Sequence, residues 1–308
     1  MSKFKNYLSL IKFSHTIFAM PFAMIGFFLA LKSGSFQRDI KGLNSTVEVE
    51  TRDVFYLKQA SILFVLVILC MIFARTAAMA FNRYLDRQWD AKNPRTAIRE
   101  IPKGIISPTN ALVFTIINCL VFMAATWFIN SICFALSPVA LAIVLGYSYT
   151  KRFTSLCHII LGVGLALAPI GAYLAVTGVF HWLPVLFSFA VLFWVSGFDI
   201  IYSLQDEDFD KAENLYSIPT SLGKKNALHV SELLHVLSAL CVIAAGYFGA
   251  FGYLYWIGVA VFCGMLLYQH SIVNPNDLRR VNIAFMTANG IASVVFAIFV
   301  LADLFLLK

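Results

Sequence analysis

The stretch ASILFVLVILCMIFARTAAMAFNRYLDRQWD, residues 60–90, joins a long apolar run to a cluster of charged side chains. A helix needs about 20 mostly apolar residues to cross the hydrocarbon core of a bilayer. The apolar part of this stretch reaches that length, and its apolar residues continue all round the helix, as in a lipid-facing span. The stretch therefore predicts a membrane-spanning helix that ends in a charged segment.

The whole chain has the composition of a membrane protein. Of its 308 residues, 60% are hydrophobic and 13% are charged, whereas a soluble domain has about 25% charged residues. Intrinsic disorder is excluded for the same reason, because disordered chains are poor in apolar residues. The six cysteines lie far apart without paired spacing, which excludes a secreted scaffold built on disulfides.

Nine apolar stretches predict an all-α, polytopic membrane protein with nine transmembrane helices and a single domain, residues 1–308. They lack the sustained alternation of apolar and polar residues that a membrane β-barrel needs. The second stretch is longer than a bilayer requires, so its C-terminal end is expected to project into water. The predicted spans are 14–32, 54–84, 109–128, 132–149, 157–177, 183–203, 227–247, 253–270 and 282–306.

The positions of the basic residues predict the orientation. With nine spans, most of the 23 Lys and Arg residues fall on the side of the N-terminus. Because basic loops face the cytoplasm, the N-terminus is expected in the cytoplasm and the C-terminus outside. We therefore expect a multi-pass protein of the inner (cytoplasmic) membrane, with its site on the cytoplasmic side, in contact with lipid and with no nucleic-acid partner.

Acidic residues gather in two clusters, NRYLDRQWD at 82–90 and DIIYSLQDEDFD at 199–210. The clusters end the second and sixth predicted spans, and the four crossings between them bring both to one membrane surface. The loops that follow the clusters are also alike, with Ile-Pro before Asn-Ala-Leu at 101–112 and again at 218–228, which indicates two weakly similar halves. Each cluster repeats a polar side chain every four residues, which a helix places on one face. The repeated positions are Asn82, Asp86 and Asp90 in the first cluster and Tyr202, Asp206 and Asp210 in the second.

Stacked carboxylates need a compensating cation, because like charges four residues apart on a helix repel each other. Carboxylate oxygens suit Mg²⁺, which commonly bridges to substrate phosphates, and the basic residues nearby suit phosphate oxygens. Carboxylates, metal and basic side chains together describe a diphosphate site. The basic set is Arg83, Arg87, Lys92, Arg95, Arg99, Lys103, Lys151 and Arg152.

Arg75 and Asp199 stand apart because each lies seven residues, or two helical turns, deeper in the membrane than a motif residue, Asn82 or Asp206. An ionisable side chain at that depth costs about 2.5–3.5 kcal/mol and marks a functional site. The two residues either pair with each other and hold the halves together, or serve the site. In the second case Arg75 faces the anionic head of a substrate and Asp199 lies beside the reacting groups.

These motifs resemble those of the UbiA family of intramembrane aromatic prenyltransferases, and most of all its 4-hydroxybenzoate polyprenyltransferase-like branch. The first family motif, Asn-x-x-x-Asp-x-x-x-Asp, is matched by the residues from Asn82 to Asp90, and the second, Asp-x-x-x-Asp, by Asp206 and Asp210. Many relatives have Arg-Pro where this chain has Arg99-Glu100, which leaves the role of Glu100 open. Further similar pieces are IKFSHTIFAMPFA (11–23), NPRTAIREIPKGIIS (93–107), YSYTKRFT (147–154) and SIPTSLG (217–223).

The resemblance implies a Mg²⁺-dependent enzyme of quinone biosynthesis. It would transfer a polyprenyl group from polyprenyl diphosphate to a ring carbon of a small hydroxylated aromatic acid such as 4-hydroxybenzoate, through an allylic cation. The implied metal ligands are Asp86, Asp90, Asp206 and Asp210, which with Asp199 near the acceptor form the expected catalytic set. The expected substrate-binding residues are Arg75, Asn82, Arg87, Arg99, Lys151, Arg152, Tyr147 and Tyr202.

Three other functions compete with this interpretation. A dihydroxynaphthoate acceptor of a menaquinone route would use the same chemistry, and the motifs alone do not separate the two acceptors. A membrane transporter would also explain intramembrane charges and a two-fold repeat, but the acidic residues cluster at one surface. A phosphotransferase acting on CDP-alcohols is disfavoured because its Asp-Gly-x-x-Ala-Arg run is absent.

Overall fold

The computed structural model describes residues 3–11, 19–33 and 49–307, and within them the chain is helical. An isolated β-bridge joins Asn274 to Asp277 in the loop before the last helices. The α-helices are α1 (Lys3–Leu10), α2 (Met20–Lys32), α4 (Val49–Leu85), α5 (Arg87–Lys92), α6 (Pro108–Ile129), α7 (Ser131–Thr150), α8 (Cys157–Thr177), α9 (Trp182–Ser203), α10 (Glu207–Ala212), α11 (Ile218–Phe248), α12 (Tyr253–Ile272) and α13 (Asn289–Leu306). A 3₁₀ turn, η2 (Leu204–Asp206), joins α9 to α10, and a π-helix, η3 (Ile283–Ala288), leads into α13.

Eight helices of the described chain are long and apolar enough to cross a membrane, and α2 is a shorter apolar helix beside them. The prediction of an all-α, polytopic protein is confirmed. The first predicted span, 14–32, is seen from Met20 onward, and residues 12–18 lie outside the described part. The count of nine spans and the orientation of the termini stay predictions.

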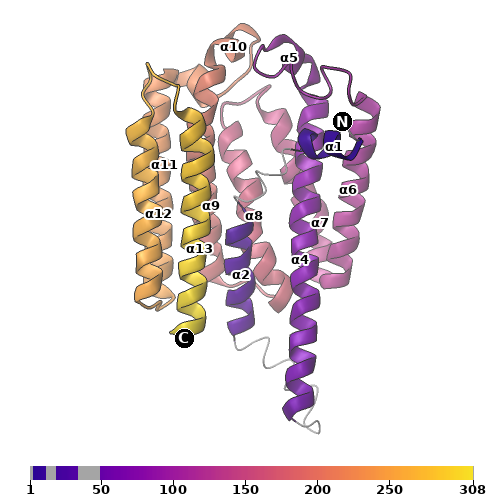
Figure 1. Ribbon diagram of the computed structural model, residues 1–308, viewed down its shortest axis with the longest axis vertical. Coiled ribbons are helices and arrows are strands. Elements are labelled where there is room, and N and C mark those ends of the chain that lie inside the picture. The colour runs from indigo at the N-terminus through magenta and orange to yellow at the C-terminus, as the bar shows by residue number, and fades with distance from the viewer. Residues whose placement is uncertain (1–2, 12–18, 34–48, 308) are drawn as a thin grey trace.

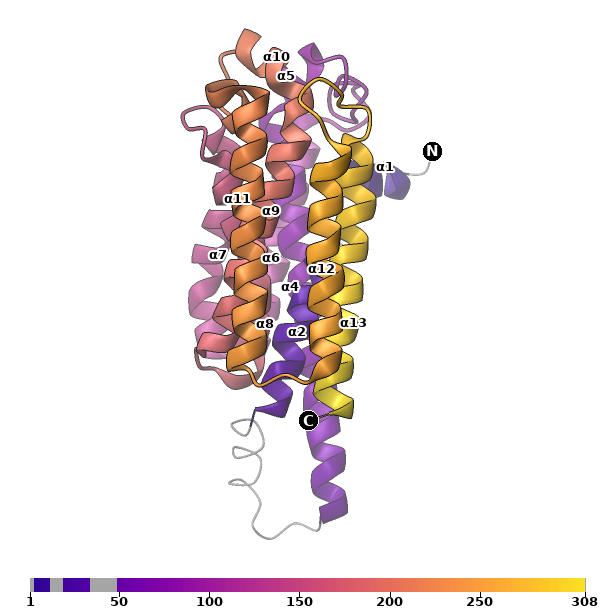
Figure 2. The ribbon, with the colours of Figure 1, turned by 90° about the vertical axis from the view of Figure 1, so that its left-hand side faces the viewer.

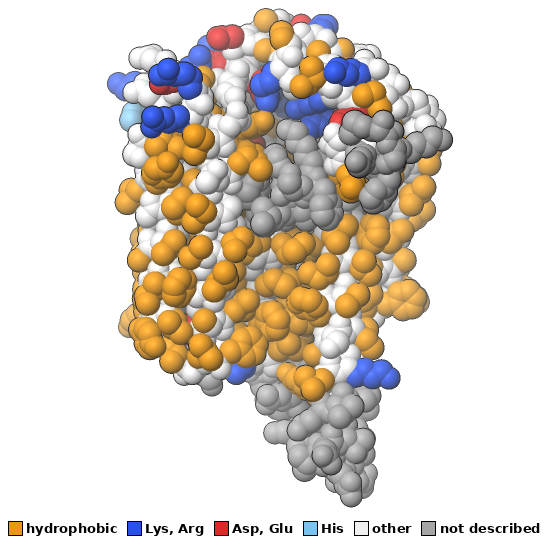
Figure 3. Space-filling model, in the orientation of Figure 1, with side chains coloured by type: hydrophobic (Ala, Val, Ile, Leu, Met, Phe, Trp, Pro, Cys, Tyr) orange, Lys and Arg blue, Asp and Glu red, His pale blue; other side chains and the backbone are white. Residues whose placement is uncertain are grey.

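The helices run side by side, with α5 and α10 together at one end of the bundle and the C-terminus at the other (Figure 1). Lys and Arg side chains gather at the α5 and α10 end, and a broad band of hydrophobic side chains covers the face below them (Figure 3). This pattern is the one expected of a bundle whose polar end lies at a membrane surface.

Helix α4 extends past its neighbours at the end opposite to α5, as two perpendicular views show (Figures 1 and 2). The expectation that the C-terminal end of this span projects into water stays a prediction. Val49, where α4 begins, lies at the projecting end, while Leu85, where it ends, lies level with the polar loops. The acidic motif that follows Leu85 keeps that end at the site.

Two glycines let α8 approach its neighbours closely. A Cβ atom on Gly26 of α2 would lie 2.1 Å from the carbonyl oxygen of Pro169, and one on Gly162 would lie 2.5 Å from that of Leu192 on α9. Small residues at such crossings allow the backbones of membrane helices to pack against each other. The start of α8 and the end of α9 are thereby held together at the site.

Candidate active site

Both acidic motifs lie where a long helix breaks. Helix α4 ends at Leu85 and α5 begins at Arg87, so Asp86 stands at the junction and the motif is not on one continuous helix as expected. The four-residue spacing nevertheless survives, because Asp86 N donates to Asn82 O at 2.9 Å and Asp90 N donates to Asp86 O at 2.8 Å. In the second motif, the 3₁₀ turn η2 interrupts the helix in the same way.

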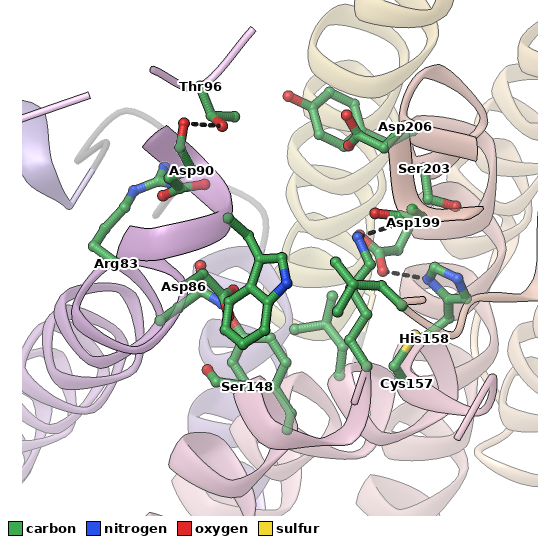
Figure 4. Close-up of a pocket in the computed structure, with 18 of the residues that line it drawn as sticks. Arg83, Asp86, Asp90, Thr96, Ser148, Cys157, His158, Asp199, Ser203 and Asp206 are labelled. Carbon is green, nitrogen blue, oxygen red and sulfur yellow. Dashed lines mark hydrogen bonds and ion pairs between the residues drawn. The ribbon is translucent and has the colours of Figure 1, made fainter. Parts of the chain in front are cut away.

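The two motifs line a single cavity of about 290 Å³ near the α5 and α10 end of the bundle. Figure 4 shows Asp86 and Asp90 on one side of this cavity and Asp199 and Asp206 on the other. The expected site residues that line it are Arg75, Asn82, Asp86, Asp90, Arg99, Tyr147, Lys151, Arg152, Asp199, Tyr202, Asp206 and Asp210.

Arg87 is the expected site residue that does not line this cavity. Its Nη1 donates to Tyr84 O at 2.7 Å, and its guanidinium lies 4.6 Å from the centre of the Tyr84 ring. The expectation that Arg87 binds diphosphate is therefore not supported by its position. The break at Asp86 is the physical reason, because the chain turns there and Arg87 contacts the end of α4.

Every aspartate of the two motifs is paired with its own cation. Three of the four carboxylates, those of Asp90, Asp206 and Asp210, are at least nine-tenths buried, so these pairs form away from bulk water. The ion pairs are Arg152 with Asp86 at 3.3 Å, Arg99 with Asp90 at 2.5 Å, Lys151 with Asp210 at 2.7 Å, and Arg95 with Asp206.

These ion pairs tie the two motifs to each other. Lys151 and Arg152 are neighbours at the end of α7, yet one contacts the second motif and the other contacts the first. Arg95, which follows α5, binds Asp206 through Nε at 3.0 Å and the hydroxyl of Tyr202 through Nη1 at 2.9 Å. Residues more than 100 positions apart in the sequence therefore form one charged network.

The network changes how its members ionise. Burial, and then repulsion from Asp90, raise the pKa of Asp86 to about 6. Burial alone would lower the pKa of Lys151, but the Asp210 carboxylate outweighs it and the pKa is raised. Asp86 therefore takes up a proton at about pH 6, and burial also raises the pKa of Asp210.

The residues of this network have the chemistry that a magnesium ion requires. One oxygen of Asp90, Oδ2, is buried and has no hydrogen-bond partner among the described residues, and carboxylate oxygens are the ligands that Mg²⁺ prefers. The described chain contains no group of three or more His, Cys, Asp and Glu side chains already arranged around a metal position. The carboxylates are instead turned to their cations, so they fit the ion in kind and would exchange a cation for it.

Two further guanidiniums line the cavity without a carboxylate of their own. The Nε atoms of Arg75 and Arg83 are buried and have no hydrogen-bond partner in the described chain. No ion pair joins Arg75 to Asp199 within the described residues; Asp199 Oδ2 lies 2.7 Å from His158 Nδ1 instead. The alternative that these two charges pair and hold the halves together is therefore wrong, and Arg75 stays available to an anion.

A second cavity, of about 400 Å³ and almost wholly apolar, lies deeper in the bundle between α4, α6, α7 and α8. The two cavities share part of their walls, so a ligand with a charged head and an apolar tail could occupy both. The shared residues are Arg75, Met79, Tyr147, Leu161 and Leu165.

Among the residues of the polar cavity that sequence reasoning missed are Trp89, His158 and Phe285. The guanidinium of Arg152 lies 4.5 Å from the Trp89 ring, and the Phe285 and Tyr202 ring centroids are 4.3 Å apart. Trp89 lies inside the first motif, which was a usable signal. His158 and Phe285 lie in apolar runs with nothing in their spacing to mark them.

The chain is similar to known proteins over most of its length. Residues 54–291 match the family model described as the UbiA prenyltransferase family. The 4-hydroxybenzoate octaprenyltransferase of Tolumonas auensis is 28% identical over 228 residues, which cover 74% of this chain and 79% of the relative. The protein of the same name from Nitrosospira multiformis is 28% identical over 230 residues, with 75% and 79% covered.

Solved structures agree with the sequence comparison. The apo structure of a UbiA homolog from Aeropyrum pernix K1 matches with a TM-score of 0.74 and 26% identity, covering 95% of this chain and 97% of that one. A UbiA homolog from Archaeoglobus fulgidus bound to GPP and Mg²⁺ matches in fold, with a TM-score of 0.72, 19% identity, and 97% and 99% covered. Since the family model spans well over half of the chain, this protein belongs to the UbiA prenyltransferase family.

Proposed function

We propose that this protein transfers a polyprenyl group from polyprenyl diphosphate to a ring carbon of a small hydroxylated aromatic acid such as 4-hydroxybenzoate. The observation that carries the proposal is that two adjacent cavities share part of their walls, one lined by the motif aspartates and their cations and the other apolar. The first suits a diphosphate and the second an isoprenoid tail. The names of the relatives support an aromatic acid as acceptor.

The charged side chains of the polar cavity would bind the diphosphate head. Asp86, Asp90, Asp206 and Asp210 would hold Mg²⁺, which when bound supplies Lewis-acid neutralisation of the phosphate charge. Their present cation partners would turn to the phosphate oxygens and stabilise pyrophosphate as it leaves. These partners are Arg95, Arg99, Lys151 and Arg152.

The remaining lining residues would serve the organic parts of the reaction. When the bond between carbon and diphosphate oxygen breaks, the allylic cation lies near the rings of Tyr147 and Tyr202, whose faces attract positive charge. Arg75, buried and without a carboxylate partner, would bind the carboxylate of the acceptor. Asp199 would lie beside the acceptor ring.

The reaction would take place at the cytoplasmic side of the inner membrane. The polar cavity lies at the end of the bundle where Lys and Arg gather, and such an end faces the cytoplasm. Single cysteines placed at exposed Lys92 and Lys103 in a cysteine-free variant test this in oriented membrane vesicles. Labelling by an impermeant maleimide only in inside-out vesicles is expected, and labelling only in right-side-out vesicles would reverse the orientation.

The test of activity uses purified protein with Mg²⁺, a polyprenyl diphosphate and either 4-hydroxybenzoate or a dihydroxynaphthoate. Prenylated product from 4-hydroxybenzoate is expected, and Asp86→Asn and Asp206→Asn should each abolish it. Asp277→Asn is the matched control, because Asp277 also pairs with an arginine, Arg279, but lies exposed in a loop outside the cavity. It should keep full activity.

Three outcomes would overturn parts of the proposal. Full activity in either cavity variant would remove the metal assignment. Product from the dihydroxynaphthoate alone would move the acceptor to a menaquinone route. Solute flux in proteoliposomes without any prenylation would favour a transporter.

A further inference from the structure

His158 and Asp199 form a hydrogen-bonded pair at the wall of the polar cavity. His158 Nδ1 lies 2.7 Å from Asp199 Oδ2, and both residues line the cavity. Figure 4 shows the imidazole behind the carboxylate as seen from Asp86. Neither residue belongs to the four aspartate–cation pairs, so the pair is a separate group within the site.

The two side chains differ in their access to the cavity. The Asp199 side chain is 24% exposed and that of His158 is 3% exposed. A ligand in the cavity can therefore touch Asp199, whereas His158 acts on it only through Asp199. The carboxylate has two oxygens, and His158 occupies one of them.

The contact with Asp199 shows which nitrogen of the His158 imidazole carries the proton. A carboxylate only accepts hydrogen bonds, so the proton of the contact lies on Nδ1 and is donated to Asp199. Nε2 is buried with no hydrogen-bond partner among the described residues. The hydrogen bond from His158 Nδ1 therefore holds Asp199 in one orientation.

Close packing of α8 against α9 at Gly162 brings His158 to Asp199. Gly162 lies one helical turn after His158, and a Cβ atom there would lie 2.3 Å from Ser196 Oγ and 2.5 Å from Leu192 O on α9. The glycine lets α8 and α9 pack closely just below the pair. A larger residue would push the imidazole away from the carboxylate.

We propose that His158 is a positioning residue that holds Asp199 as the proton acceptor for the aromatic substrate. The proposal rests on the proposed prenyl transfer. A ring carbon gives an electron pair to the allylic cation and the new C–C bond forms. The C–H bond at that carbon then breaks, its electron pair restores the aromatic ring, and the proton passes to the free oxygen of Asp199. It leaves to water when the products depart.

The experiment measures pyrophosphate release and prenylated product in parallel for His158→Leu and His158→Asn. The leucine removes the donor, whereas an asparagine amide can place an N–H near the position of Nδ1. General-base catalysis contributes about 10²–10⁴-fold, so we expect His158→Leu to lower kcat for prenylation by about 10–100-fold through misplacement of Asp199. The KM for polyprenyl diphosphate should not change, and His158→Asn should recover most of the rate.

A second histidine pair supplies the control for loss of a half-buried imidazole outside the site. His270 Nε2 lies 2.9 Å from His235 Nδ1, away from both cavities. His270→Leu should lower the unfolding temperature and leave the ratio of product to pyrophosphate unchanged. If His158→Leu does not fold, His158→Gln replaces it, because the longer amide reaches past the Nδ1 position.

The results separate this inference from the proposed function. Equal impairment of the leucine and asparagine variants in folded protein would overturn the positioning role, as would an unchanged kcat in His158→Leu. Absence of product from the wild-type protein would refute the prenyl transfer itself, and the inference with it.

Discussion

At the scale of single residues, each motif aspartate holds a cation that the proposed substrate would need. Asp206 and Arg95 illustrate the exchange, because the guanidinium forks onto both carboxylate oxygens. If a magnesium ion alone bound Asp206, Arg95 would lose its carboxylate partner. If a diphosphate alone bound Arg95, Asp206 would lose its cation. An unpaired buried charge is costly, so we expect the two ligands to bind cooperatively, each strengthening the other.

Replacing Arg95 by lysine tests this exchange. Lysine keeps the charge but loses the forked geometry, and hydrogen bonds to charged groups contribute about 1.5–3 kcal/mol each. Arg95→Lys should therefore raise the KM for polyprenyl diphosphate by about 10-fold or more, as measured by initial rates. Arg279→Lys, in which the exposed pair with Asp277 is altered in the same way, should leave KM unchanged. Equal KM values in the two variants would contradict the exchange.

The raised pKa of Asp86 predicts a pH dependence of magnesium binding. When the pH falls below about 6, the pKa of Asp86, the carboxylate carries a proton that the metal must displace. The rise in unfolding temperature that Mg²⁺ causes should therefore be full near pH 7.5 and shrink as the pH falls through 6. Without metal the sign is opposite, because a raised carboxylate pKa makes the folded state more stable as the pH falls.

Unfolding curves with and without Mg²⁺, at matched pH values, separate the two effects. The metal-dependent difference should be smaller in Asp86→Asn and should no longer change near pH 6. An equal effect of Mg²⁺ at pH 5.5 and 7.5 in the wild-type protein would contradict Asp86 as a ligand.

At the scale of elements, the site is made where helices stop being regular. Helix α4 breaks at Asp86 and α9 passes into η2, and each break is followed by a short helix that carries the last aspartate of its motif. A third irregularity, the π-helix η3, places Phe285 against Tyr202 at the cavity wall. Single-turn π segments occur often at functional sites.

Asn289 fastens η3 to its neighbours. Its Nδ2 donates to Phe285 O at 2.9 Å. Its Oδ1 accepts from Trp194 Nε1 at 2.9 Å and from Gln269 Nε2 at 2.8 Å, and Asn289, Trp194 and Gln269 are fully buried. Asn289→Leu leaves two buried donors without an acceptor and should cost about 1–3 kcal/mol of stability, seen as a lower unfolding temperature. Asn226→Leu is the control, because Asn226 bonds only Leu222 O on an exposed helix face. An equal loss in both variants would contradict a special role of Asn289.

At the scale of the whole molecule, the bundle holds a charged cavity at its polar end next to an apolar one in its interior. Gly171 lies on the wall of the apolar cavity with open space where a Cβ atom would be. Gly171→Phe should fill this space and raise the KM for a long polyprenyl donor about 10-fold, since a buried aromatic ring displaces roughly 1.5–3 kcal/mol of tail contacts. A short donor should be affected less.

Gly264 on α12 supplies the matched control for Gly171→Phe. It also has open space at the Cβ position but lines neither cavity, so Gly264→Phe should leave the KM of both donors unchanged. If Gly171→Phe raised the KM of short and long donors equally, the apolar cavity would not be the tail site.

The sequence predicted the helical bundle and most of the polar cavity because both depend on local signals. Apolar length marks a span, and a four-residue spacing of aspartates marks a site even when the helix breaks within it. The same pattern could not show which cation pairs with which carboxylate. Arg95 belonged to the basic set without being singled out, and its pairing with Asp206 depends on how the loop after α5 folds back over α9.

Other features depended on contacts that leave no trace in spacing. His158 meets Asp199 only because α8 crosses α9 at Gly162. Glu100, whose role the sequence left open, accepts a hydrogen bond from Ser9 and so connects α1 to the loop before α6. That Arg87 lies outside the cavity could not be predicted, because its position in the motif says nothing about the turn at Asp86.

Under the proposed function, the size of the apolar cavity bears on how the length of the prenyl tail in the product is set. A space of about 400 Å³ is typical of pockets for drug-sized molecules, and a tail of many isoprene units exceeds it several times over. Under the proposed function, the protein would grip the first units of the donor and leave the remainder among the acyl chains. The protein would then not select the length of the prenyl chain. That length would be set earlier, by the synthase that elongates the donor.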